Sequence, residues 1–347
     1  MAATESPPLA HIVSTGSALP GDPIDNATLG ERLGMDRLWE QWVATFVGTL
    51  GRHLSFDLDT GKPLGTLADL GEQAGRAALE SGGIAPGEID AVVLGTATPD
   101  MLMPATVNIV ADRLGIDGVP TYQLQSGCTG AVQALSLGAK LAADPDTRRV
   151  LVLAGDSCTK HFDLEMDFRA LPPTQLINCV LFGDGAGAVV LSGEPEPDSI
   201  AIRRILTRLV GGGRAPGHEL DWFGPADRAD SRPAVAEDFK AVEESVPALA
   251  VEIVTELLDD VDWAAGEVDF LLPPQLSGRM TERIVAGLGL PGAEEVSCVD
   301  EVGNCGNALP LLQLDRLRDR IAPGDRALAV AVESSKWLKG GLALEAV

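Results

Sequence analysis

Cys128 stands in the sequence context that turns a thiol into a nucleophile. It lies in Gly127-Cys128-Thr129-Gly130, between an extended run, 119–124, and an apolar stretch, 131–143, whose only charge is Lys140. This order predicts a strand, a tight turn with glycines on both sides, and a buried helix. Unpaired N–H groups and the dipole at the helix N-terminus favour a thiolate there, and the glycines let a substrate approach closely. We therefore expect a cysteine nucleophile.

The other four cysteines do not suggest chemistry of their own. Cys158, Cys179, Cys298 and Cys305 are scattered, and none has a partner at CxxC spacing or a Cys/His cluster around it. We interpret them as small buried hydrophobes. The sequence thus predicts no metal site, and five unpaired thiols in a large chain are typical of a reducing cytoplasm.

Composition narrows the class of protein. The chain has 347 residues, 45% of them hydrophobic, with 39 glycines and a net charge of −25. This length is enough for one large or two medium domains. The negative charge argues against nucleic acid and anionic membrane surfaces as partners. Neither a signal-peptide pattern nor an apolar run of membrane-spanning length is present, so we expect a cytoplasmic protein.

The elements that must position Cys128 recur along the chain. Buried strands are expected at 11–16, 89–96, 149–155 and 182–191, with helices at 67–81 and 105–114. The second half repeats the order with 268–272, 296–304 in place of the strand before Cys128, helix 308–320, and strands 327–332 and 340–344. Continuous apolar strands between helices predict a layered α/β protein with two pseudo-symmetric halves.

The boundary between the halves is expected in the loop 193–199, so that 1–192 carries the cysteine and 200–347 forms the second half. Within this repeat, Asn304 stands at the turn that corresponds to the Cys128 turn. The internal symmetry therefore predicts that Asn304 lies near Cys128.

Three segments in order, 125–130, 182–188 and 302–304, carry a family resemblance. With these three segments, the chain resembles the thiolase-fold condensing enzymes over nearly its whole length. Within them it resembles the ketoacyl-ACP synthase III group. The resemblance implies a five-layered αβαβα fold and a homodimer. It implies an acyl group passed from acyl carrier protein or CoA to Cys128, with no permanently bound cofactor. It also implies that Asn304 hydrogen-bonds a thioester carbonyl.

Two departures from the family pattern affect the expected chemistry. Pro274 occupies the position of the family's catalytic histidine, and proline can neither donate a hydrogen bond nor take a proton. The segment 333–337 replaces the family's glycine loop, although the N–H of Ser335 can still complete an oxyanion hole with that of Cys128. In the family, the histidine helps to hold the enolate oxygen that forms when a malonyl thioester is decarboxylated. Loss of one such donor typically costs about a hundredfold or more in rate, so the missing histidine disfavours this decarboxylation.

Further correspondences concern the donor and the acyl pocket. Trp42 matches the tryptophan that stacks on CoA, but Phe46 replaces the arginine that clamps the other face of the adenine. Arg279 matches a basic contact to acyl carrier protein, and Arg283 follows one helical turn later. This favours a carrier-protein donor, unless these arginines only form a solvated helix face.

Met101 and Met103 match a segment that reaches across the dimer to the partner's acyl pocket, which Pro274 would also line. Flexible methionines at such a place suggest an adaptable, modest apolar cavity. The alternative is that both are ordinary core methionines.

A replacement for the missing imidazole has to come from elsewhere in the chain. The candidates are His161, Glu333 and Lys336. His218 is expected to be solvated in a polar loop, and His11 and His53 to lie far from the site.

These observations predict a ketosynthase III-like acyltransferase of specialised metabolism. Acyl-Cys128 would pass its acyl group to a small acceptor through oxygen, nitrogen or a carbon nucleophile that is already activated, with carbon–carbon bond formation and cyclisation among the outcomes. The alternative is a non-catalytic partner subunit of an active condensing enzyme.

Overall fold

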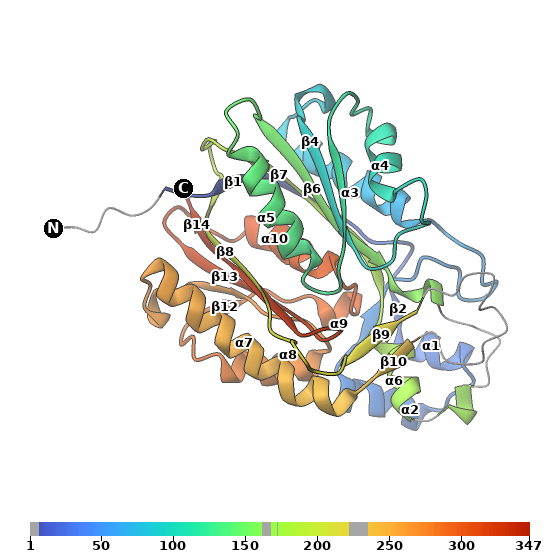
Figure 1. The fold of residues 1–347 in the computed structure, drawn as a ribbon. Coiled ribbons are helices and arrows are strands. Elements are labelled where there is room, and N and C mark those ends of the chain that lie inside the picture. Colours follow the sequence, from blue (N-terminus) through green and yellow to red (C-terminus); the bar gives the residue numbers. More distant parts are fainter. Residues whose placement is uncertain (1–6, 162–167, 172, 222–234) are drawn as a thin grey trace.

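The computed structural model describes residues 7–161, 168–171, 173–221 and 235–347 (Figure 1). One set of strands comprises β1 (Ala10–Ala18), β4 (Ala91–Thr96), β5 (Thr121–Gln125), β6 (Arg149–Ser157) and β7 (Asp184–Ser192), in the order β5-β4-β6-β7-β1. The other comprises β8 (Ile200–Leu209), β11 (Phe270–Leu272), β12 (Glu294–Glu295), β13 (Arg326–Glu333) and β14 (Leu338–Ala346), in the order β12-β11-β13-β14-β8. The spatial order is the same in both sets, and β1 joins them by pairing with β8.

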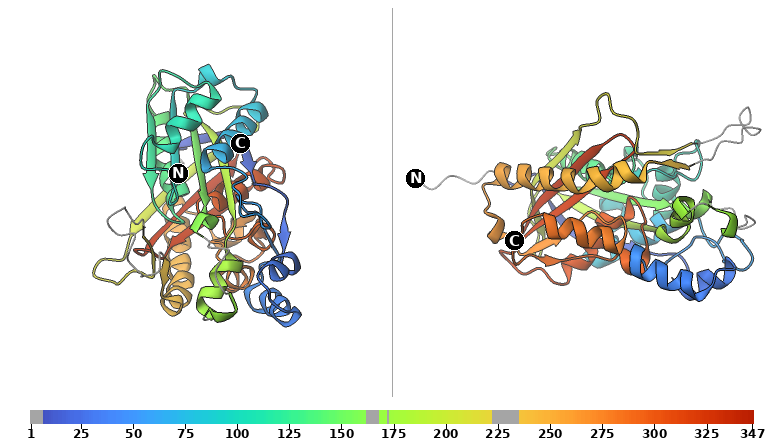
Figure 2. Two further views of the ribbon diagram at one scale, coloured as in Figure 1. Left: turned by 90° about the vertical axis from the view of Figure 1, so that its right-hand side faces the viewer. Right: turned by 90° about the horizontal axis from the view of Figure 1, so that it is seen from below.

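Helices cover both sets on both faces (Figures 1 and 2). The helices concerned are α3 (Leu67–Gly82), α4 (Thr106–Leu114), α5 (Gly130–Ala142), α7 (Phe239–Val261), α8 (Gly278–Gly287) and α10 (Ala308–Arg318). Side chains of α5 and α10 share one core with strands of both sets, whereas α3 with α4, and α7 with α8, each pack on an outer face. The predicted five-layered αβαβα architecture is confirmed. Whether 1–192 and 200–347 are separate units stays a prediction.

Shorter elements gather at one end of the layers (Figure 1). They are α1 (Asn26–Arg32), α2 (Arg37–Trp42), a π-helix (Val43–Val47), α6 (Pro173–Leu181), α9 (Val299–Val302), and the two-stranded pairs β2 (Ile24–Asp25) with β3 (Gly51–Arg52) and β9 (His218–Leu220) with β10 (Val235–Glu237). Single turns of 3₁₀-helix occur at Pro86–Glu88, Cys158–His161, Phe168–Ala170 and Ala265–Glu267. This end holds the candidate site.

Local signals explain why most elements begin and end as predicted. Thr66 and Asp69 form a reciprocal capping box at the start of α3, and Gly83 ends the helix in the left-handed conformation. The expected strand at 296–304 is wrong, because its counterpart in the fold is the two-residue β12. Gln275 Oε1 accepts the backbone N–H groups of Cys298 and Val299, each at 2.7 Å. Those donors are therefore not available to a strand ladder.

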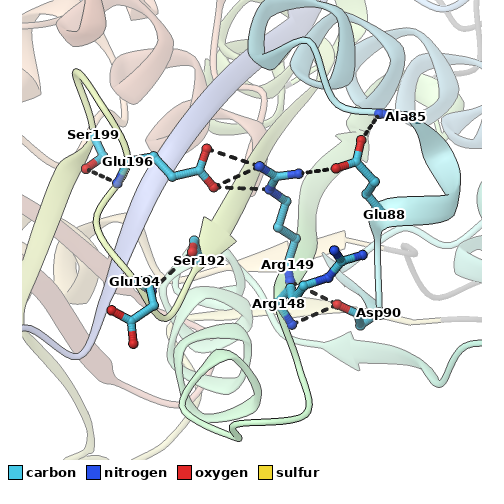
Figure 3. Close-up of polar contacts among 9 residues, drawn as sticks. All are labelled: Ala85, Glu88, Asp90, Arg148, Arg149, Ser192, Glu194, Glu196 and Ser199. Atoms are coloured by element: carbon cyan, nitrogen blue, oxygen red, sulfur yellow. Dashed lines mark hydrogen bonds and ion pairs between the residues drawn. The ribbon is translucent and has the colours of Figure 1, made fainter.

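The N-terminal end of β6 is held in place by paired charges (Figure 3). The Arg149 guanidinium contacts Glu88 Oε1 at 2.6 Å and both carboxylate oxygens of Glu196 at 3.0–3.1 Å. Asp90 accepts the backbone N–H groups of Arg148 and Arg149. These contacts tie the loops at that end to the start of the strand, with opposite charges in direct contact.

Candidate active site

A cavity of about 600 Å³ lies where the two halves meet. Cys128 of the first half lines it, as do Asn304, Glu333 and Ser335 of the second. His218, on β9, also lines it. The structure thus brings together the two residues that the internal repeat placed side by side. The volume is in the range of a small-molecule site.

An amide from the second half fixes the turn that carries Cys128. Asn307 Nδ2 donates to the Ser126 carbonyl at 2.9 Å, and Asn307 Oδ1 accepts the Ala131 N–H at 3.2 Å. The backbone N–H and Nδ2 of Asn307 both donate to Asp156 Oδ2 at 2.8 Å. One side chain therefore holds both sides of the cysteine turn.

Asp156 is the buried anchor of this arrangement, and sequence reasoning missed it. Its Oδ1 accepts four hydrogen bonds, from the hydroxyl of Thr96, the N–H of Ala97, and the N–H and hydroxyl of Thr98, at 2.8–3.1 Å. Burial raises the pKa of Asp156 above its ordinary value, and the donors oppose that rise only in part. All contacts reach it as an acceptor, so its role is to order the backbone around the site.

The carboxylate of Glu333 lies on the nucleophile's backbone. Its Oε2 accepts the N–H of Cys128, and its Oε1 accepts the N–H of Ser335 at 2.6 Å. Glu333 is 3% exposed. The two N–H groups that the sequence assigned to an oxyanion hole both donate to the Glu333 carboxylate in this structure, one to each oxygen. Gly127 makes room for it, because a Cβ there would overlap the carboxylate.

The surroundings of Cys128 disfavour ionisation of its thiol. Burial raises its pKa well above the ordinary value, and the charges of Glu333 and Asp156 and a hydrogen bond to Glu333 raise it further. The thiolate therefore stays a prediction, because the surroundings of the sulfur in this structure favour the thiol. Helix α5 begins two residues after the sulfur, and a helix N-terminus contributes at most about 2 kcal/mol. That contribution acts against burial and the charges of two carboxylates.

Pro274 lies beside the nucleophile, where the histidine of the family pattern was expected. Pro274 and Cys128 both line a second, small cavity of about 20 Å³, which is room for about one water molecule. No imidazole can act from this position. Asn304 is 4% exposed, and its Oδ1 accepts the Gly306 N–H at 3.0 Å.

His218 lies in a different environment from the solvated loop that was predicted for it. It is not a solvated loop residue, since it belongs to β9, its side chain is 23% exposed, and it lines the main cavity. Glu237 stands opposite it on β10, with Glu237 Oε1 3.6 Å from His218 Nδ1. Burial alone would lower the pKa of His218, but the adjacent Glu237, with Glu333 and Glu219, raises it overall. No local sequence signal links two positions that are 19 residues apart in the chain.

The remaining candidates lie elsewhere. Lys336 does not line the cavity, and its Nζ donates to the Arg214 carbonyl at 2.7 Å. His161 ends a short 3₁₀ turn, but its side chain lies outside the described residues. Met101 and Met103 are exposed, Met103 to 86%, and line neither cavity of the single chain. Their proposed contact across a dimer stays a prediction.

The residues assigned to donor binding share one surface. Arg279, at the start of α8, donates from Nε to the Thr45 carbonyl at 2.8 Å, which places it against the π-helix that follows Trp42. Arg279 also pairs with Glu282 and Arg283 with Glu243. Both arginines are at least half exposed. Their contact with a carrier protein stays a prediction.

Two features are absent from the described residues. These residues contain no group of three or more His, Cys, Asp or Glu side chains arranged to hold a metal ion. No helix among them is long and apolar enough to cross a membrane.

Comparison with known families agrees with the fold. The model of the 3-oxoacyl-[acyl-carrier-protein] synthase III family matches residues 122–206, and the model of its C-terminal part matches 258–334. A β-ketoacyl-[acyl-carrier-protein] synthase III of Streptomyces coelicolor is 33% identical over 338 residues, covering 92% of each chain. The chain belongs to the ketoacyl-ACP synthase III family of condensing enzymes. Enzymes of this family act on thioesters of acyl carrier protein or CoA and use no permanently bound cofactor.

Two solved structures relate the chain to specialised metabolism. AbyA1, described as a tetronic acid condensing enzyme, is 57% identical with a TM-score of 0.95, over 97% of this chain and 99% of that one. The priming β-ketosynthase of the R1128 polyketide biosynthetic pathway is 27% identical with a TM-score of 0.81, over 99% and 98%.

Proposed function

We propose that this protein is a condensing enzyme that builds a tetronic acid ring from two thioesters through an acyl-Cys128 intermediate. The observation that carries the proposal is the 57% identity, over almost the whole length, to a tetronic acid condensing enzyme. The cavity that joins Cys128 and Asn304 supplies a nucleophile and an amide beside it.

The charge of the cavity favours a neutral acceptor. Asp156, Glu237 and Glu333 line it, and no Arg or Lys is among the described residues that do. A malonyl carboxylate would meet like charges there, which disfavours its binding. Pro274 also removes the donor that would hold the enolate formed by decarboxylation. A β-ketoacyl thioester avoids both problems, because its carbon is already acidic and no carboxylate has to leave.

The bonds of the ring define the steps. A tetronic acid needs one new carbon–carbon bond and one new ester bond. Cys128 first attacks an α-hydroxyacyl thioester and releases its thiol. The deprotonated α-carbon of the β-ketoacyl thioester then attacks the acyl carbon, and the Cys128 sulfur leaves and is reprotonated. Finally the α-hydroxyl attacks the remaining thioester, loses its proton and releases the second thiol, which closes the lactone.

Glu333 is suited to the loading step. Its carboxylate touches both the N–H pair and the thiol of Cys128. As the thioester enters, the thiol proton passes to Glu333 while the C–S bond forms. When the bond to the donor sulfur breaks, Glu333 gives this proton to the departing sulfur, which leaves as a thiol. A protonated Glu333 is a weaker acceptor, so the N–H groups of Cys128 and Ser335 become available to the developing oxyanion.

The proposal includes an acyl-carrier-protein donor and a homodimer. Trp42 and Arg279 lie on adjoining segments at the surface, and Arg279 keeps its guanidinium half exposed. The exposed apolar residues at 101–103 are best explained by cover from a second copy of the chain. Light scattering of the purified protein tests the dimer directly.

The test is a loading assay followed by a product assay. Wild-type protein incubated with an α-hydroxyacyl carrier protein should carry the acyl group on the Cys128 peptide in mass spectrometry. Addition of a β-ketoacyl thioester should then yield the tetronate. Cys128→Ala should lose both signals, whereas Cys298→Ala, which removes a buried thiol away from the cavity, should keep them. Tetronate formation by Cys128→Ala would overturn the proposal.

One observation favours a second candidate function, a non-catalytic partner subunit. In this structure the Glu333 carboxylate engages the N–H pair, and the surroundings of Cys128 disfavour its thiolate. A subunit of that kind would not load any acyl group alone and would co-purify with an active condensing enzyme. The same loading assay separates the two functions.

A further inference from the structure

Seven titratable side chains line the main cavity among the described residues: Cys128, Asp156, Cys158, Cys179, His218, Glu237 and Glu333. The second step of the proposed function needs one of them to take a proton from the carbon acid. The three thiols have raised pKa values, chiefly because of burial, and are neutral. The choice therefore lies among the carboxylates and the imidazole.

Two of the carboxylates are committed to backbone and side-chain donors. Asp156 accepts six hydrogen bonds that order the cysteine turn. Glu333 is engaged by the N–H groups of Cys128 and Ser335. Neither has the freedom to meet a second substrate while it holds these contacts.

His218 and Glu237 form a pair in which a carboxylate lies beside an imidazole. They are direct partners across the antiparallel strands β9 and β10, so their side chains share one face. The Glu237 side chain is 10% exposed, and its Oε2 is buried without a hydrogen-bond partner among the described residues. Its Oε1 faces His218 Nδ1. A carboxylate at Nδ1 fixes the tautomer and leaves Nε2 as the nitrogen that can accept a proton.

The segment that departs from the family pattern also fixes His218 in place. The Gly217 N–H donates to the Ser334 carbonyl at 3.0 Å, and Trp337 Nε1 donates to the Ala215 carbonyl at 2.7 Å. A Cβ at Gly217 would lie 2.7 Å from the Trp337 ring, so only glycine allows this close approach. The Glu333–Trp337 segment therefore holds the strand with His218 at the edge of the same cavity.

We propose that His218, oriented by Glu237, is the general base that replaces the missing family histidine in the condensation step. This inference rests on the function proposed above. Nε2 of His218 takes the α-proton of the β-ketoacyl thioester, and the carbanion forms a bond to the acyl carbon of acyl-Cys128. The C–S bond breaks, and the imidazolium returns its proton to the Cys128 sulfur. Both groups regain their starting states, and no external acid, base or oxidant is needed.

The test separates the two half-reactions. Enzyme first loaded with the α-hydroxyacyl group is mixed with β-ketoacyl thioester, and tetronate is followed in a single turnover from pH 5.5 to 9. In His218→Gln, loading of Cys128 should stay within about twofold of wild type. Condensation should fall by about 10²–10⁴-fold, the usual range for loss of a general base. His53→Gln is the matched control, because His53 Nδ1 contacts the carbonyls of Pro20 and Gly21 and does not line the cavity.

The pH profile gives a readout that a structural role would not move. A base must be neutral, so condensation should rise with pH through the pKa of His218. The charges of Glu237, Glu333 and Glu219 place that pKa above the ordinary value of about 6.5. Glu237→Gln removes the nearest charge and should move the rising limb to lower pH. His218→Gln should abolish it.

The outcomes are distinct. Wild-type protein that fails to load contradicts the proposed function, and this inference falls with it. Normal loading with an unchanged condensation rate and pH limb in His218→Gln contradicts the inference alone. Loss of loading and condensation together in a folded His218→Gln, judged by its circular dichroism and Tm, would also overturn it, because His218 would then not be specific to the second step.

Discussion

Strand β6 has two ends that handle charge in opposite ways. At its start, Arg149 lies between Glu88 and Glu196, and each charge meets one of opposite sign. At its other end, Asp156 faces a cavity that Glu237 and Glu333 also line, without Arg or Lys among the described lining residues. The first arrangement holds loops together. In the second arrangement, uptake of protons is the main way to neutralise the carboxylates. Such an arrangement suits a site that has to move protons.

Substitution of Asp156, at the cavity end of β6, should have the largest effect on stability. Asp156→Asn replaces one accepting oxygen by a donor that faces donors, the groups of Thr96 and Thr98 or those of Asn307. We expect the free energy of unfolding to fall by about 2–4 kcal/mol, since two or more donors lose their partner. Urea unfolding followed by circular dichroism measures this, and a loss below about 0.5 kcal/mol would contradict the anchoring role.

The same residue has a defined pH dependence. The pKa of Asp156 is raised in the folded state, so the native protein binds this proton more tightly than the unfolded chain. This group therefore lowers stability as pH rises from its ordinary pKa near 4 through the folded pKa. That part of the pH dependence should be absent in Asp156→Asn.

Glu333→Gln should have the next largest effect. It should speed up one reaction of Cys128 and slow down another. Loss of the negative charge should lower the pKa of Cys128, so alkylation by iodoacetamide at pH 8 should become faster than in the wild type. Acyl loading should slow by about 10–100-fold, because the proton acceptor is gone. A variant faster in both assays would show that Glu333 only restrains the thiol.

The smallest effect is expected at the paired end. Arg149→Ala should lower the free energy of unfolding by about 1 kcal/mol, because partly exposed ion pairs contribute little individually. Loading of Cys128 should be unchanged. A large loss of loading in this variant would mean that the two ends of β6 are coupled, and the contrast between them would fail.

Much of the fold could be predicted from sequence because its signals are local. The capping box at Thr66 and the apolar runs of β4 and β6 each lie within a few residues. Cys128 was recognisable from its turn, and Asn304 from the internal repeat. These predictions required no knowledge of contacts between distant segments.

The parts of the site that were wrong depend on such distant contacts. The carboxylate on the Cys128 N–H comes from Glu333, 205 positions away, and after burial its charge is the next largest cause that raises the pKa of the thiol. His218 was taken for a loop residue because its partner, Glu237, joins it only when β9 and β10 pair. Polar segments of two or three residues per strand carry no periodic pattern from which such pairing could be inferred.

Gly127 links two positions that are remote in the chain. A side chain there would displace the Glu333 carboxylate. Among natural relatives, an alanine or serine at the residue before the nucleophile should therefore be found only together with a shorter residue in place of this glutamate. Such paired changes would distinguish, from sequence alone, the family members that gate their thiol with an acid from those that leave it open.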